Sequence, residues 1–176
     1  MVEPLVGAIA LPDGTLIRGR GRREPVPDGP LPDFGLYLGR QPGPVVTRGP
    51  LPSAAARRTR RFPFPWPTPR WTVWRPDWSA EWVDWPDFRV PRDDQLAAAA
   101  IERAYRLARA GRRVEVACGG GTGRTGTVIA CMVVLAGQTA ADAVAWTRRY
   151  YRPRAIETRG QRRWIEHFAV ARRPCD

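Results

Sequence analysis

Apolar residues recur at helical spacing in four stretches, all of them in the second half of the chain. This periodicity predicts helices over residues 93–110, 124–136, 139–151 and 158–171. Thr139 and Thr158 stand where helix N-caps are expected. Gly111 and Gly137 stand where the first and second of these patterns stop. Residues 128–135 form a continuous apolar run that is too short to span a membrane, so we expect a buried central helix there.

Two further stretches have the character of strands. Apolar residues surround Leu36, and apolar and polar residues alternate over 113–117. Together with the helical patterns, these strands predict an α/β fold, in which helices flank a central, mainly parallel twisted sheet.

The length and composition suit one domain. The chain has 176 residues, of which 43% are hydrophobic, and this is enough to bury a core. We therefore expect a single domain over residues 1–176. Residues 1–32 are expected to form an N-terminal extension with short strands, and residues 41–80 an insertion.

The insertion over residues 41–80 is rich in proline, tryptophan and arginine. Its prolines exclude long helices between residues 39 and 70. We expect residues 53–61, which hold a run of four arginines and one threonine at 57–61, to form a mobile loop. The remainder either wraps the body with its aromatic side chains or forms a lip that selects anionic, aromatic substrates. The wrap is the simpler interpretation.

The candidate chemistry lies between the strand at 113–117 and the helix that follows it. Here Cys118 and Arg124 flank Gly119, Gly120, Gly121, Thr122 and Gly123. Backbone N–H groups of a glycine-rich loop at a helix N-terminus have no helical partners, so they can converge on a phosphate. Arg124 can offer a planar fork to two phosphate oxygens. The same positive field predicts that Cys118 acts as a nucleophile.

Three other interpretations of this loop are weaker. The segment 121–126 fits G-x-G-x-x-G, but the acidic strand end that a dinucleotide site needs about 20 residues later is absent. A Walker A loop needs a lysine, and the chain contains none. A tight glycine turn with a structural cysteine leaves the Arg124–Thr125 pair unexplained.

A proton donor for a leaving oxygen must approach such a loop from outside, and Asp87 is the best candidate. It stands on a turn beside Trp85 and Pro86, which we expect to stiffen the turn as a hinge. Asp77 and Asp84 are weaker candidates.

The Trp85-Pro86-Asp87 turn and the Cys-x5-Arg-Thr-Gly loop together resemble the protein-tyrosine phosphatase superfamily, in particular its compact dual-specificity members. The resemblance extends from about residue 33 to 168 and implies a phosphatase-type fold. It also implies that Gln161, in a third loop at 155–161, helps to place the hydrolytic water. A surface helical glutamine is an equally economical interpretation of Gln161. Thr125 can donate its hydroxyl toward the Cys118 sulfur, or cap the helix.

Two positions depart from the family pattern. Ala117 stands where the family has a histidine that favours the thiolate, so activation must depend on the loop amides and Arg124. Glu157 replaces the first glutamine of the third loop and adds negative charge. The single histidine, His167, is expected to be structural or on the surface.

The formal net charge of +12 favours polyanionic partners such as phosphorylated proteins. An arginine-, alanine- and proline-rich composition also follows from a GC-rich genome, so charge ranks substrates only weakly. Three cysteines cannot pair completely and the N-terminus does not resemble a secretory signal, so we expect a cytoplasmic protein. We expect a monomer without metal, cofactor, membrane span or stable nucleic-acid partner.

The sequence therefore predicts a cysteine-dependent phosphatase that acts through a phosphocysteine on phosphotyrosine proteins, with phosphoserine and phosphothreonine as a second specificity. One alternative is a phosphate-binding pseudophosphatase. Another is a phosphatase that acts on phosphoinositides or RNA 5′-triphosphates.

Overall fold

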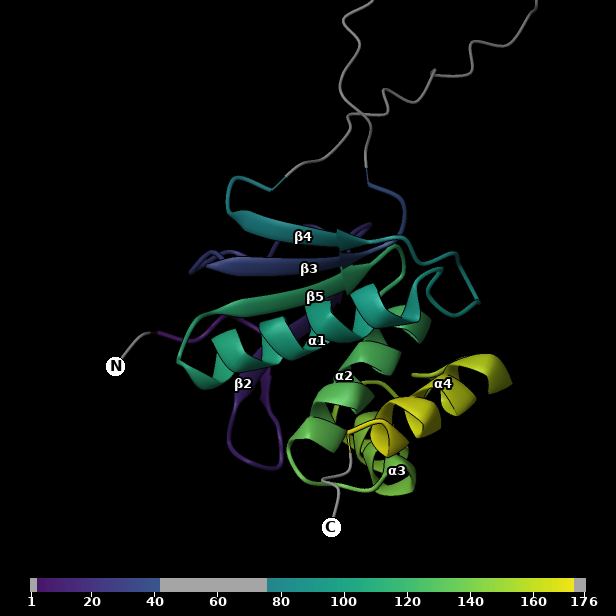
Figure 1. Ribbon diagram of the computed structural model, residues 1–176. Coiled ribbons are helices and arrows are strands. Elements are labelled where there is room, and N and C mark those ends of the chain that lie inside the picture. Colours follow the sequence, from purple (N-terminus) through teal and green to yellow (C-terminus); the bar gives the residue numbers. More distant parts are fainter. Residues whose placement is uncertain (1–2, 42–75, 173–176) are drawn as a thin grey trace, which may run out of the picture. The chain divides into compact units, whose positions relative to one another are not determined.

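One five-stranded sheet organises the part of the chain that the computed structural model describes, residues 3–41 and 76–172 (Figure 1). Its strands are β1 (Ala8–Ala10), β2 (Leu16–Gly21), β3 (Phe34–Leu38), β4 (Ser79–Val83) and β5 (Val114–Cys118). The spatial order is β1-β2-β5-β3-β4, and only the β1–β2 pair is antiparallel. The predicted mainly parallel sheet is confirmed.

The four predicted helices are also confirmed, with ends within one residue of those expected. They are α1 (Asp94–Arg109), α2 (Gly123–Leu135), α3 (Ala140–Tyr150) and α4 (Arg159–Val170). The side chains of Thr139 and Thr158 accept backbone N–H bonds at the starts of α3 and α4. Gly111 and Gly137 follow α1 and α2 with φ angles of 78° and 97°, which glycine adopts without strain.

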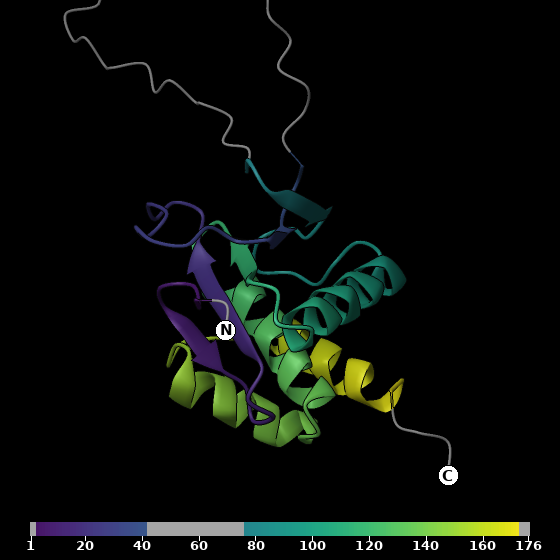
Figure 2. The same cartoon turned by 90° about the vertical axis from the view of Figure 1, so that its left-hand side faces the viewer.

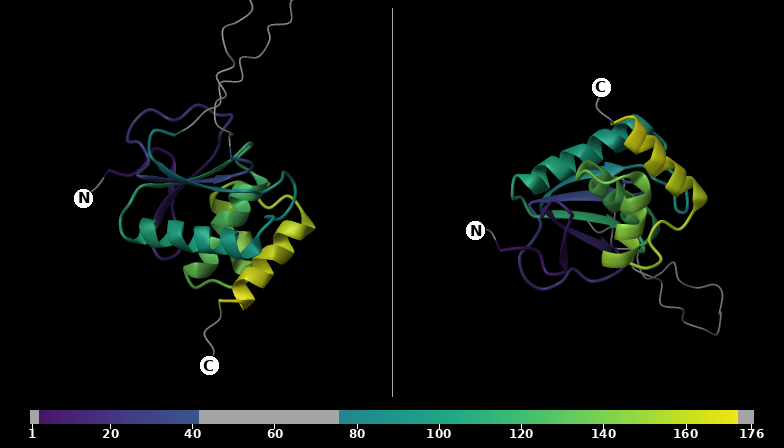
Figure 3. Two further views of the ribbon diagram at one scale, coloured as in Figure 1. Left: turned by 45° about the horizontal axis from the view of Figure 1, so that its top comes forward. Right: turned by 90° about the horizontal axis from the view of Figure 1, so that it is seen from below.

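The helices gather on one side of the sheet (Figure 2). Helices α1 and α2 pack on the strands, while α3 and α4 pack against α2 (Figure 3). Helix α2 is consequently buried from Gly123 through Val133, as its apolar run predicts. The core consists of apolar side chains from both layers, among them Ile17, Leu36, Val116, Ile101, Ile129 and Ile165. No helix in the described residues is long and apolar enough to cross a membrane.

A buried ionic cluster joins three strands. The Glu115 carboxylate is fully buried and accepts bonds of 2.9 Å from Nε of Arg18 and from Nε of Arg20. The hydroxyl of Tyr37 donates to the other carboxylate oxygen of Glu115 at 3.0 Å. Burial, followed by the Glu115 charge, raises the pKa of Tyr37 above its ordinary value. Since Glu115 balances two buried arginines, its removal would leave uncompensated charge between β2 and β5.

The edge strand β4 was not expected from the sequence. It begins at Ser79, inside the stretch 41–80 that the sequence assigns to the insertion, and it pairs in parallel with β3. Its sequence, SAEWV, has no clear apolar alternation, so its pairing depends on tertiary contacts such as that of Trp82 with the Tyr37 ring, 5.0 Å between centroids. The predicted mobile loop at 53–61 lies outside the described residues. Strands β1 and β2 lie within residues 1–32, where short strands are expected, and β2 is an interior strand.

Candidate active site

The glycine-rich loop joins the end of β5 to the start of α2. Cys118, the last residue of β5, is 1% exposed, and the N–H of Gly121 points at its sulfur at 3.2 Å. Gly121 has a φ of 70°, and a Cβ at this position would collide with the backbone of Gly21. The backbone here can therefore take this path only with glycine.

The carbonyl oxygens of this loop are bonded from outside. Arg22 N donates to Cys118 O at 2.7 Å, and Arg23 N donates to Gly119 O at 3.2 Å. Arg152 Nη1 donates to Gly120 O at 3.0 Å, and the Tyr151 hydroxyl donates to Gly121 O. Because the two ends of a peptide unit point in opposite directions, outward carbonyls direct the amide N–H groups inward, as anion binding requires.

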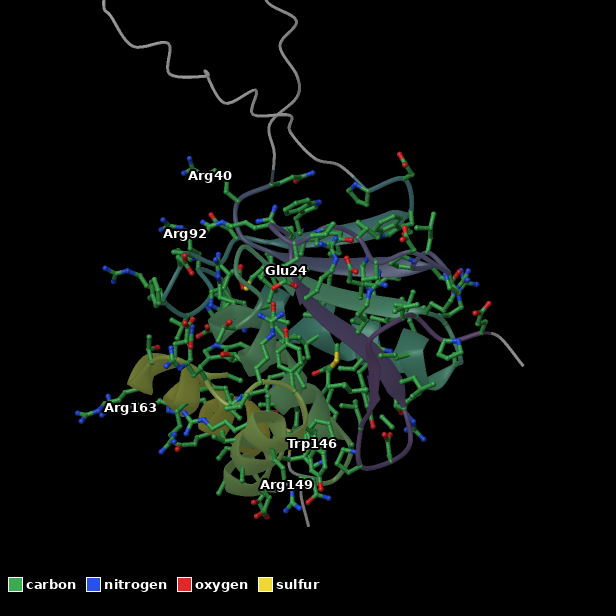
Figure 4. All side chains as sticks on the ribbon, turned by 180° about the vertical axis from the view of Figure 1, so that it is seen from behind. Glu24, Arg40, Arg92, Trp146, Arg149 and Arg163 are labelled. Atoms are coloured by element: carbon green, nitrogen blue, oxygen red, sulfur yellow. The ribbon has the colours of Figure 1, made fainter. Side chains whose placement is uncertain are left out.

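This outer layer of donors was not expected from the sequence. It comes from the segment after β2 and from the end of α3, both distant in sequence from the loop. Arg152 is held in turn by Glu24, which is labelled in Figure 4 and whose carboxylate lies 3.0 Å from Arg152 Nη2. The run of arginines after β2 is the signal that could have pointed to the first part of this layer.

Arg124 lies in the first turn of α2 and is 7% exposed. Its Nη1 donates to Trp85 O at 2.9 Å and more weakly to Leu38 O at 3.4 Å. Its Nη2 forms an ion pair of 2.8 Å with Asp87 Oδ1. Its Nε is buried and has no partner among the described residues. The guanidinium is thus fixed in direction by two backbone carbonyls and retains one donor for a ligand.

The turn that carries Asp87 lies between β4 and α1. Trp85 is fully buried, its Nε1 donates to Arg89 O at 2.7 Å, and its ring meets Trp164 edge-on at 5.1 Å. These contacts anchor the base of the turn, whereas the Asp87 side chain is 58% exposed. The structure therefore brings Asp87 to Arg124 from outside the loop. The weaker candidate Asp84 pairs instead with Arg92 at 3.2 Å on the surface.

Thr125 lies inside α2, so its interpretation as the helix cap is wrong. The N-cap position belongs to Thr122, whose side chain makes no capping bond. The Thr125 hydroxyl is fully buried and accepts the Cys118 N–H at 2.9 Å. The Thr125 hydroxyl therefore contacts the backbone of Cys118.

Gln161 is completely buried, so the surface interpretation is also wrong. Its Oε1 accepts from Glu157 N at 2.8 Å and from Thr158 N at 3.2 Å, which forms a capping box at the start of α4. Its Nε2 points to Arg89 O at 3.5 Å and so faces the Asp87 turn.

Glu157 and Ala117, the two departures from the family pattern, lie near the two ends of the loop. The Glu157 carboxylate packs where a Cβ of Gly123 would stand, at the first residue of α2. Ala117 is fully buried and brings no polar side chain to the cysteine. His167 is exposed on α4.

Comparison with known proteins agrees with this arrangement. Residues 82–165 match the family model described as "Swiss Army Knife protein, DSP-PTPase phosphatase domain". The matched segment is just under half of the chain, and it contains the Asp87 turn, the Cys118 loop and Gln161. This match places the segment 82–165 with the dual-specificity and tyrosine phosphatases.

Two curated relatives support this assignment to the phosphatase superfamily. The chain is 40% identical over 57 residues to "Protein tyrosine phosphatase domain-containing protein 1" of Danio rerio, and 43% identical over 56 residues to the protein of the same name from Mus musculus. Each match covers 32% of this chain and 8% of the relative's own length.

The phosphatase fold is shared with a solved structure. The crystal structure of Tk-PTP in the active form aligns with a TM-score of 0.54 at 20% sequence identity, over 79% of each chain. This likeness shows the fold.

Proposed function

We propose that this phosphatase domain hydrolyses phosphate monoesters through a phosphocysteine intermediate on Cys118. The observation that carries the proposal is the ion pair of Arg124 with Asp87, 2.8 Å long, above a loop whose carbonyls are all turned outward from residue 118 to 121. In this proposal the nucleophile comes from the end of β5, the anion cradle from the loop and Arg124, and the acid from the turn before α1, whose Asp87 contacts Arg124.

In the first step, the Cys118 thiolate attacks phosphorus in line with the ester oxygen. The phosphorus–sulfur bond forms while the bond to the ester oxygen breaks, and Asp87 gives its proton to that oxygen. The loop N–H groups and Arg124 Nε neutralise the equatorial oxygens. Nε of Arg124 is available for these oxygens, because the carbonyls of Trp85 and Leu38 hold Nη1 of the same guanidinium.

In the second step, water attacks the phosphocysteine and Asp87, now ionised, takes its proton. The phosphorus–sulfur bond breaks and releases orthophosphate and the thiolate. Gln161 Nε2 faces the Asp87 turn and is the candidate to hold this water. Thr125 stabilises the departing thiolate by fixing the Cys118 backbone and by offering its hydroxyl proton.

We infer that the substrates are proteins that carry phosphotyrosine, with phosphoserine and phosphothreonine as a second specificity. The names of both curated relatives and the dual-specificity family description support this inference. The net charge of +12 favours anionic substrates of this kind. We further propose that the protein acts as a monomer in the cytoplasm.

The alternative is a domain that binds phosphate without turning it over. Ala117 and Glu157 favour it, since one removes a polar neighbour of the cysteine and the other brings a carboxylate to the start of α2.

Hydrolysis of an aryl phosphate by the wild type and by Cys118→Ser, from about pH 5 to pH 8, separates these two functions. If the domain is an enzyme, the wild type hydrolyses the ester and the rate of Cys118→Ser falls to background. Cys131→Ala is the matched control, because Cys131 is buried in α2 and should be dispensable for turnover. A wild type that binds orthophosphate but hydrolyses nothing would establish the binding function instead.

A further inference from the structure

Arg152, just beyond the end of α3, contacts the phosphate loop from outside, and the proposed mechanism does not use its charge. Its Nη1 donates to Gly120 O at 3.0 Å. The N–H of Gly121 points at the Cys118 sulfur at 3.2 Å. Gly120 O and the Gly121 N–H are the two ends of a single peptide unit, and in a trans peptide they point in opposite directions. One peptide unit therefore separates the Arg152 guanidinium from the sulfur.

A hydrogen bond from a cation to a carbonyl polarises the amide group that carries this carbonyl. The oxygen gains negative charge, and the N–H at the other end becomes a stronger donor. In the loop this donor faces Cys118, to which the buried Ala117 brings no polar side chain. The Thr122 hydroxyl also donates to Gly120 O, at 3.3 Å, but it carries no charge. The charge of Arg152 therefore acts on the sulfur along the peptide.

Glu24 fixes the direction of the Arg152 side chain. Both of its carboxylate oxygens accept from Arg152 Nη2, at 3.0 and 3.2 Å, which leaves Nη1 directed at the loop. The Arg152 guanidinium carbon also lies 5.5 Å from the centre of the Tyr151 ring. The carboxylate is itself held on β2, because its Oε2 accepts the N–H of Gly21 at 3.3 Å, and Gly21 pairs with Cys118.

The Arg152 side chain is 31% exposed, and its guanidinium keeps its charge there. Burial acts to lower the pKa of Arg152, but the hydrogen bond with Glu24 and the charges of Tyr151, Glu24 and Cys118 outweigh burial and raise the pKa. The cation that bonds the loop carbonyl is therefore stable over the whole pH range in which a thiol ionises.

Other ionisable groups near the Cys118 sulfur are Arg22 after β2, Arg124 in α2 and Tyr151 after α3. Arg22 bonds the loop with its backbone N–H, and Tyr151 bonds the next carbonyl with its hydroxyl. Arg124 pairs with the acid turn. Of these groups and Arg152, it is Arg152 that places a charged donor on the peptide whose N–H faces the sulfur.

We infer that Arg152 is a positioning residue that stabilises the thiolate form of Cys118 through the Gly120–Gly121 peptide, and that Glu24 holds Arg152 in place for this task. This inference rests on the proposed function for the role of Cys118 as the nucleophile. The two side chains thus supply the stabilisation that Ala117 does not provide.

Alkylation of Cys118 by iodoacetamide, measured over a range of pH by peptide mass spectrometry, tests this inference without turnover. The reagent is neutral, so its encounter with the protein does not depend on charge. We expect Arg152→Gln to lower the rate about threefold on the acidic side of the inflection in the pH profile, since glutamine keeps a donor but loses the charge. On the alkaline side the rates should converge, because Cys118 is then a thiolate in both proteins. Arg152→Lys restores the charge and should recover part of the rate.

Arg149→Gln is the matched control, because it removes the same charge from an exposed side chain of α3 (Figure 4). It should leave the profile unchanged, and thermal unfolding of each variant confirms that the domain is intact. Equal profiles for Arg152→Gln and the wild type, or an equal change in Arg149→Gln, would overturn the inference.

Glu24→Ala separates action along the peptide from simple charge attraction. Removal of a carboxylate near Cys118 raises the alkylation rate if only charge matters. If Glu24 holds Arg152 on the carbonyl, the same change lowers the rate, as Arg152→Gln does. A rate equal to or above that of the wild type would overturn the inference. A domain whose alkylation depends on Arg152 but which hydrolyses no ester would refute only the proposed function.

Discussion

Some glycines at this site are constrained both by a positive φ and by the atoms that a Cβ would contact. Gly39 is the clearest case, because its φ is 142° and a Cβ there would lie 3.2 Å from Arg22 Nη2 and 3.4 Å from Arg124 Nη1. Gly14 has a φ of 82° but no atom within 4 Å of the position of a Cβ. The two glycines therefore separate conformational strain from contact with the arginines.

We predict that Gly39→Ala and Gly14→Ala each lower the free energy of unfolding by about 1 kcal/mol, the ordinary cost of a positive φ in a residue with a Cβ. Only Gly39→Ala should also weaken the binding of orthophosphate, since its Cβ displaces the guanidinium groups. Denaturant unfolding and calorimetry measure the two effects. Equal phosphate affinity in the two variants would show that the contacts at Gly39 do not position the arginines.

The residues with chemistry in a local motif could be predicted from the sequence. Cys118, Arg124 and the loop glycines stand within one segment, and Asp87 stands on a turn that its neighbours define. Arg152 could not be predicted, because it reaches the loop from the end of α3, whereas the arginines after β2 are a signal that could have pointed to Arg22. The buried state of Gln161 was also missed, since a helical glutamine is usually exposed.

At the scale of elements, the parallel pairing of β3 and β5 is reinforced at the start of both strands. Asp33 accepts the Arg113 N–H at 2.8 Å and pairs with the Arg113 guanidinium, also at 2.8 Å. These bonds outweigh the partial burial of the carboxyl and lower the pKa of Asp33 from 3.8 to about 2. A carboxyl whose folded pKa is lowered stabilises the fold above its unfolded pKa and loses this effect as pH falls toward the folded value.

We therefore predict that Asp33→Asn lowers the free energy of unfolding by roughly 2 kcal/mol near neutral pH, as a shift of this size implies. The difference from the wild type should shrink between about pH 4 and pH 2, the window between the unfolded and folded pKa values. Denaturant unfolding across this range measures it. Asp28→Asn, at an exposed position, serves as the control. A difference that stays constant down to pH 2 would contradict the assigned ion pair.

The helices and the two strands with clear patterns could be predicted because periodicity and caps are local signals. The order of strands could not, since β2 inserts beside β5 through contacts between residues almost one hundred positions apart, such as Arg18 with Glu115. Strand β4 was missed for the same reason, as its pairing with β3 defines it.

At the scale of the whole molecule, the excess of 12 positive charges should accelerate the encounter with dianionic substrates. We predict that kcat/KM for an aryl phosphate falls by about threefold or more between about 0.05 M and 0.5 M sodium chloride, as the charges are screened. The rate at which a neutral alkylating reagent modifies Cys118 should change much less. Equal salt dependence of the two rates would show that the net charge does not guide the substrate.

The measurement that tests the central claim most directly is the capture of the covalent intermediate. The wild type and Asp87→Asn are mixed with an aryl phosphate, quenched in acid within the first turnovers and analysed by peptide mass spectrometry. We predict one phosphoryl group on the peptide that contains Cys118, and none on the peptide that contains Cys131. An active protein that never carries phosphate on Cys118 would contradict the phosphocysteine mechanism.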